Sequence, residues 1–100
     1  MLLYNTTYLF DKQLDEVFVA WMKDKFIPLL KETGTFSDHY FCKVMLAKED
    51  GGLTYSLQLL FKSREQLEKY INSFEPRTKA VFKARFQDQI ICFSSLLQEI

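Results

Sequence analysis

The sequence predicts an α+β fold in which four strands and two helices follow one another in the order β-α-β-β-α-β. Stretches rich in aromatic, leucine and β-branched residues alternate with stretches whose apolar residues recur at helical spacing. A glycine-containing turn joins the two middle strands, as is typical of a hairpin. The chain has 100 residues, which is the size of one domain, so we expect a single domain over residues 1–100.

The first strand is expected over residues 2–10, LLYNTTYLF. Asp11 offers an N-cap oxygen for the helix that follows. Pro28 lacks a backbone N–H, so the helix should kink or end near it, and Gly34 is a suitable C-cap. Between these limits the apolar residues share one broad helical arc: Leu14, Val17, Phe18, Trp21, Met22 and Leu29.

The second half of the chain predicts a hairpin, a helix and a last strand. Strands at about 38–47 and 53–61 flank a turn at 48–52. Ser63 and Gln66 fit a capping box, and the apolar spacing that follows is helical: Leu67, Tyr70, Ile71 and Phe74. Pro76 is expected to interrupt this helix before a further helical stretch at about 77–86 and a strand at about 88–97.

The compact solution for this order is a ferredoxin-like fold. Its antiparallel sheet has the strand order 4-1-3-2, with both helices on one face. Cys42 and Cys92 then lie on opposite edges, three strand spacings or about 14 Å apart, too far for a disulfide within the chain. We expect both to be buried, inert thiols.

The second face of this sheet should be polar if the protein is a monomer, because no helix covers it. Alternation along the strands instead predicts a mixed face. A polar centre is formed by Asn5, Thr7, Ser56 and Gln58. Large apolar groups surround it: Leu3, Leu9, Phe41, Met45 and Phe93. Such a patch is typical of an interface, so we expect a homodimer whose two sheets pack face to face and close a barrel-like space.

Composition agrees with two burial surfaces. Ten Phe, five Tyr and one Trp are a heavy aromatic load for one small core. Lys+Arg 13 against Asp+Glu 13 gives no charge that favours nucleic acid, and also no net repulsion between identical subunits. The longest apolar run, residues 17–22, is too short to span a membrane, and the start lacks the pattern of a signal peptide. These features predict a cytoplasmic protein that binds neither nucleic acid nor membranes.

Several segments resemble an uncharacterised bacterial family known only as a domain of unknown function. They are Tyr4-Asn5-Thr6-Thr7, Ala20-Trp21-Met22-Lys23, Ile27-Pro28, Phe36-Ser37-Asp38 and Tyr55-Ser56-Leu57-Gln58. The resemblance covers essentially the whole chain and implies a dimeric α+β barrel. A Gln87-Asp88 pair stands where the family would have a Phe-Gly turn before the last strand. The resemblance implies no activity.

His39 and Cys42 are the candidate metal ligands, because their spacing gives two donors per chain and a dimer would double them. The simpler interpretation is a histidine at the beginning of a strand, beside Asp38 at the surface. We therefore expect no metal site, and since no cofactor motif is found we expect no cofactor.

Asn5 supports a second function hypothesis. In the cofactor-independent monooxygenases and haem-degrading enzymes of the superfamily that the resemblance implies, an asparagine on the first strand helps to hold the substrate. An enzyme of this kind would use an inter-sheet cavity lined by Asn5, Thr7, Ser56 and Gln58. The first hypothesis is a structural or small-ligand-binding homodimer with no assignable catalytic site, in which these residues form a hydrogen-bonded network at the interface and the ligand is a small apolar molecule.

Five basic residues are expected to have ordinary surface roles. Lys25 falls within the apolar arc of the first helix, where snorkelling or a change of helix phase at Pro28 explains it more simply than a reactive lysine. The other four point around most of a helix and favour a solvated surface over an anion site: Arg77, Lys79, Lys83 and Arg85.

Overall fold

The computed structural model describes residues 1–45 and 52–100. The strands are β1 (Leu2–Asp11), β2 (Asp38–Lys43), β3 (Gly52–Phe61) and β4 (Ile91–Gln98). The helices are α1 (Asp15–Trp21), α2 (Ile27–Lys31), α3 (Arg64–Lys69) and α4 (Glu75–Phe86). The expected turn at 48–52 lies, except for Gly52, outside the described residues.

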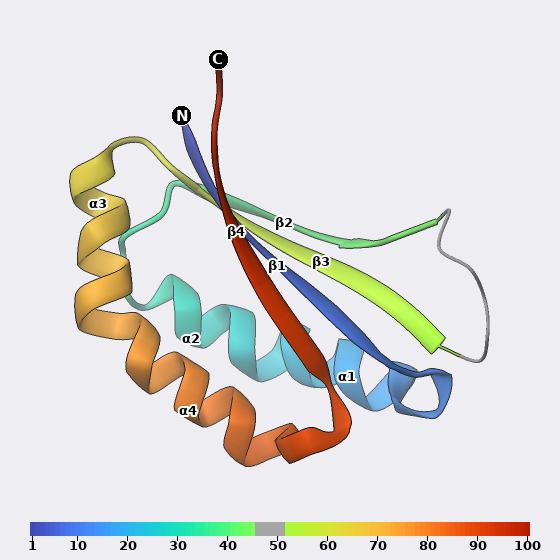
Figure 1. The fold of residues 1–100 in the computed structure, drawn as a ribbon. Coiled ribbons are helices and arrows are strands. Elements are labelled where there is room, and N and C mark those ends of the chain that lie inside the picture. The colour runs from blue at the N-terminus through green and yellow to red at the C-terminus, as the bar shows by residue number, and fades with distance from the viewer. Residues whose placement is uncertain (46–51) are drawn as a thin grey trace.

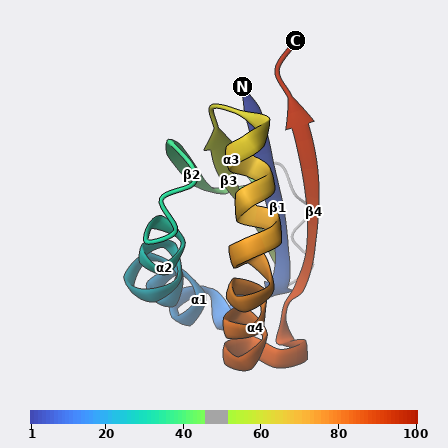
Figure 2. The same cartoon turned by 90° about the vertical axis from the view of Figure 1, so that its left-hand side faces the viewer.

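One antiparallel sheet carries the strands in the order β2-β3-β1-β4, which is the neighbour relation 4-1-3-2 counted from the other edge. All helices lie on one face of this sheet (Figures 1 and 2). The expected α+β, ferredoxin-like arrangement of strands and helices is therefore present. We call the face toward the helices the inner face and the opposite face the outer face.

Both long helical segments contain a wide turn of π-helix. It spans residues 22–26 between α1 and α2, and residues 70–74 between α3 and α4. Ile27 and Glu75, the residues before the two prolines, donate their N–H groups to carbonyls five residues earlier, at Met22 and Tyr70. The wide turn leaves room for the proline, which can donate no such bond. The prediction that Pro76 interrupts the helix was wrong, because the chain stays helical through it.

The ends of the helical segments match the sequence in two of three places. Ser63 Oγ accepts a hydrogen bond from the Gln66 N–H at 3.2 Å, and Gly34 has a φ of 67° beyond the end of α2. Asp11 was predicted to be an N-cap and is not one: it is the last residue of β1, and within the described residues its side chain makes no capping bond. A short 3₁₀ turn at residues 12–14 leads into α1 instead.

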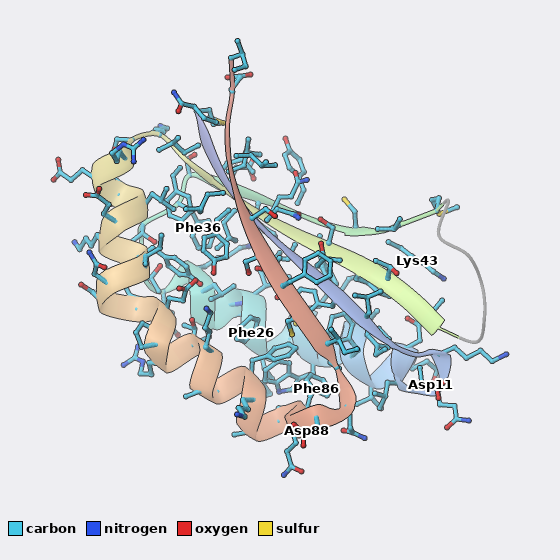
Figure 3. The ribbon with its side chains drawn as sticks, in the orientation of Figure 1. Asp11, Phe26, Phe36, Lys43, Phe86 and Asp88 are labelled. Atoms are coloured by element: carbon cyan, nitrogen blue, oxygen red, sulfur yellow. The ribbon has the colours of Figure 1, made fainter. Side chains whose placement is uncertain are left out.

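The core lies between the inner face and the helices and consists mainly of aromatic rings. Phe26 and Phe86 lie in this layer, whereas Asp11 and Asp88 lie at the outside of the molecule (Figure 3).

Gln87, after the end of α4, has a φ of 53° and a ψ of −125°, a backbone conformation suited to glycine. We expect Gln87→Gly to raise the free energy of unfolding by about 1 kcal/mol, because the strain is relieved. Urea denaturation measures this, with Asp88→Gly as the control that should bring no gain. Equal effects of the two variants would contradict the prediction.

Candidate functional site

The outer face brings the four predicted polar residues together. Asn5 pairs with Gln58 across β1 and β3, and Thr7 pairs with Ser56. Ser56 Oγ donates to Asn5 Oδ1 at 2.6 Å, and Asn5 Nδ2 donates to Thr7 Oγ1 at 3.4 Å. The centre of this face is thus a hydrogen-bonded network.

Apolar side chains flank this network, mainly along β4. Phe93 is 55% exposed and pairs with Thr7, while Ile91 and Leu97 pair with Leu9 and Leu3. The five apolar side chains of these pairs occupy the same face, since each lies at an alternate position of its strand. No helix of the described residues covers them (Figure 2).

Phe41 and Met45 were predicted on this face, and both placements were wrong. Phe41 pairs with buried Leu57 and its ring packs 5.6 Å from that of Tyr55, so it belongs to the inner face. Met45 lies beyond the end of β2 and is 83% exposed. The register instead places Tyr40 and Cys42 on the outer face, opposite Gln58 and Ser56.

The two cysteines do lie on opposite edge strands, but the expectation that they are buried was wrong. Both are exposed. Cys42 is on the outer face, and Cys92 is on the inner face of the edge strand β4, which the helices leave partly open. His39 alternates with Cys42 across β2 and faces the other way, so the two cannot bind one metal ion. Among the described residues no group of three potential ligands comes together.

A cavity of about 570 Å³, which the sequence did not predict, lies between the sheet and the helices. Its apolar wall includes Tyr8, Phe26, Leu57 and Phe82. Its polar groups come from β1, β4 and the segment 70–83: Tyr4, Thr6, Tyr70, Glu75, Thr78 and Ser94, with Lys79 and Lys83. An apolar cavity of this size with a few converging polar groups is typical of a small-molecule site.

Glu75 is the unusual member of this set. Its side chain is only 13% exposed, and Oε1 lies 3.6 Å from Lys79 Nζ. Oε2 is buried and has no hydrogen-bond partner among the residues that the structure describes. The π turn explains the placement, because it sets Glu75 one wide turn above buried Tyr70. An uninterrupted α-helix, at 3.6 residues per turn, would rotate position 75 away from the cavity.

Tyrosines around the core are held in the neutral form. Burial raises the pKa of Tyr4, and the neighbouring Glu75 carboxylate raises it further. Burial also raises the pKa of Tyr8 and of Tyr70, where a hydrogen bond to Thr78 opposes the shift. Burial, with a hydrogen bond to Asp15, raises the pKa of Tyr55 to about 12.

These shifts predict loss of stability in alkali. Because the folded-state pKa values lie above the ordinary tyrosine value of 10.0, their stabilisation is complete below that pH and is lost as the pH rises through the folded values. The free energy of unfolding should therefore fall between pH about 9 and about 12. Urea denaturation across this range tests the fall. Phenolate absorbance that develops at the same pH in native and denatured protein would contradict it.

All five basic residues considered in the sequence are exposed. Lys25 is exposed, because it lies within the first π turn, which shifts the phase of the helix. Arg77, Lys79, Lys83 and Arg85 are exposed as well, as the sequence predicted, and Lys79 and Lys83 also border the cavity.

The sheet order and the one-sided helix layer define a ferredoxin-like α+β protein. Over residues 1–100 the chain matches the family described as Domain of unknown function (DUF4286), and it belongs to this family. No curated protein matches its sequence. Among the described residues, no helix is long and apolar enough to cross a membrane.

Solved structures share the fold at low sequence identity. A dimeric ferredoxin-like protein from an uncultured marine organism has a TM-score of 0.77 and 16% identity over 99% of this chain and 97% of its own. An ethd-family protein from Bacillus halodurans has a TM-score of 0.72 and 11% identity over 100% of both chains. A protein from Bacillus cereus described as an antibiotic-biosynthesis monooxygenase has a TM-score of 0.66 and 13% identity over 96% of this chain and 89% of its own.

Proposed function

We propose that this protein binds a small, mainly apolar molecule in the cavity between sheet and helices, and that it does so as a homodimer joined through the outer face. The cavity carries the binding proposal. Its volume of about 570 Å³ lies within the usual range for ligand sites. Half of its lining residues carry ring or leucine side chains, whose burial by an apolar ligand is favourable because it removes apolar surface from water.

Naphthalene titration tests ligand binding. We expect wild-type protein to bind naphthalene, as measured by calorimetry, and Ser94→Trp to abolish binding. Ser94 lies on exposed β4 at the cavity wall, so an indole there fits the strand and fills the opening. Gln98→Trp is the matched control, because Gln98 lies at an alternate position of the same strand, opposite Leu2 and outside the lining. Absence of naphthalene binding by the wild type would refute the proposal.

The outer face supports the homodimer. Its apolar side chains Leu3, Leu9, Ile91, Phe93 and Leu97 would be removed from water by a second copy of the same sheet. The polar network of Asn5, Thr7 and Ser56, with Gln58 beside it, would lie at the centre of the contact. Equal numbers of basic and acidic residues, 13 each, add no net repulsion between copies. Two solved structures of the same fold are of proteins described as dimeric.

Light scattering tests the dimer. At micromolar concentration we expect a mass of twice the chain's 11.9 kDa. A mass of one chain would refute this part of the proposal and leave the cavity part standing. A cytoplasmic location belongs to the same proposal and is supported by the two exposed thiols, which a reducing compartment would keep free.

The second candidate is an enzyme of the cofactor-independent monooxygenase or haem-degrading kind, working between the two sheets of the dimer. The network of Asn5, Thr7 and Ser56 favours it, because these side chains offer both donors and acceptors on an otherwise apolar face. Haem titration tests the haem branch. A change in the Soret band at stoichiometric haem would support it, and an unchanged band would remove it.

A further inference from the structure

We propose that the cavity selects a small aromatic molecule bearing a neutral hydroxyl group, and that Glu75 Oε2 accepts the hydrogen bond of that hydroxyl. This inference rests on the proposed binding of a ligand in the cavity. It names the chemical class of that ligand.

One carboxylate oxygen of Glu75 is unpaired in the described part of the chain. Glu75 Oε2 is buried against the cavity and has no hydrogen-bond partner within the described residues. A buried acceptor without a donor costs free energy, which a ligand donor would recover. Thr78 does not supply this donor, because its Oγ1 donates to the Glu75 backbone carbonyl at 3.1 Å. The Tyr4 hydroxyl lies near enough to the carboxylate for its pKa to be raised by it, but it makes no hydrogen bond to Oε2 in the structure.

The charged side chains that line the cavity favour a ligand without a charge. Lys79 Nζ lies 3.6 Å from Glu75 Oε1, so the carboxylate already has a cationic neighbour, and Lys83 adds a second positive charge to the lining. An ammonium group would meet both lysines. A carboxylate group could pair with the exposed lysines, but it would be repelled by Glu75 and has no proton to share with Oε2. A neutral hydroxyl avoids both conflicts and supplies one donor.

The aromatic rings that line the cavity favour a flat ligand. Tyr8, Phe26 and Phe82 present a cluster of rings, with centroids 5.3 Å apart for Tyr8 and Phe82 and 5.4 Å apart for Phe26 and Phe82. All three rings line the cavity. A flat aromatic ligand extends such tilted ring packing, which adds to the free energy of apolar burial.

Three naphthalene derivatives separate the possibilities: naphthol, the methyl ketone acetonaphthone, and naphthoate. They share the ring and differ in the polar group, which is a donor, a neutral acceptor and an anion. We expect wild-type protein to bind naphthol at least about tenfold more tightly than either of the others, as measured by calorimetry. Glu75→Gln should bring naphthol and acetonaphthone to similar affinities, because the amide offers both a donor and an acceptor. Glu75→Leu should abolish the preference for naphthol, because it offers neither.

Glu68→Gln is the matched control, since Glu68 is an exposed carboxylate on α3 outside the lining, and it should keep the wild-type preference. Thermal unfolding of each variant confirms that it is folded. Equal wild-type affinity for the three compounds, or a naphthol preference that survives Glu75→Leu, would overturn this inference and leave ligand binding in the cavity intact. Failure of wild-type protein to bind any of these compounds or naphthalene would overturn both.

Discussion

Replacing Phe18 with alanine is expected to lower the free energy of unfolding by about 4 kcal/mol. Phe18 is 0% exposed and lies where α1 meets the sheet. Its ring centroid lies 4.5 Å from that of Phe10, 5.3 Å from Tyr8 and 5.4 Å from Tyr55. Alanine would leave a cavity that three packed rings cannot close without moving strands β1 and β3.

Urea denaturation measures this loss. Val17→Ala is the matched control, because Val17 is the preceding helix residue and is 45% exposed, so its truncation should change stability by less than about 1 kcal/mol. A loss below about 2 kcal/mol for Phe18→Ala would show that the aromatic core repacks around the cavity.

Phe93→Arg is expected to convert the proposed dimer into a monomer. Phe93 lies on the outer face opposite Thr7, next to the polar network. In a face-to-face dimer each of the two arginines, one per copy, would be buried without a counter-charge. At a cost of about 3 kcal/mol for one such group, the dimer Kd should rise at least about a hundredfold. In the monomer the side chain is 55% exposed, so the fold should tolerate the change.

Light scattering over a concentration series gives the dimer Kd. Val17→Arg serves as the control, because it adds the same charge at an exposed apolar site on the helix side of the molecule. Dimerisation that is weakened equally by the two variants would point to net charge as the cause. Dimerisation unaffected by Phe93→Arg would place the interface elsewhere.

The sequence was sufficient for the order of the elements, because period-2 and helical spacing are local properties of the chain. It also brought Asn5, Thr7, Ser56 and Gln58 to one face, since β1 and β3 are regular over ten residues each. It failed for Phe41, because nothing in the strand itself says which of its two apolar sides faces the helices. Only pairing with Leu57 decides that.

Glu75 was missed for a different reason. A prediction from helical periodicity assumes that the helix rotates by the same angle at every residue. A π turn changes this angle locally, and the composition of the segment gives no sign of it. The sequence did contain one sign of the π turns, which is the proline after each of them. Ile27-Pro28 and Glu75-Pro76 each come directly after the π turn of their helical segment. A glutamate directly before a helical proline was thus the one local clue to the cavity.

The repeated wide turn also makes the two halves of the chain alike, since each has the same strand–helix–strand order of elements. β1, α1, α2 and β2 form one half, and β3, α3, α4 and β4 form the other, with β1 and β3 paired antiparallel at the centre of the sheet. Ile27 and Glu75 occupy corresponding positions in the two halves, because each precedes the proline and bonds to the carbonyl five residues before it. The first half fills the position with a buried isoleucine. The same wide turn therefore places an apolar side chain beside the sheet in one half of the chain and a carboxylate in the other.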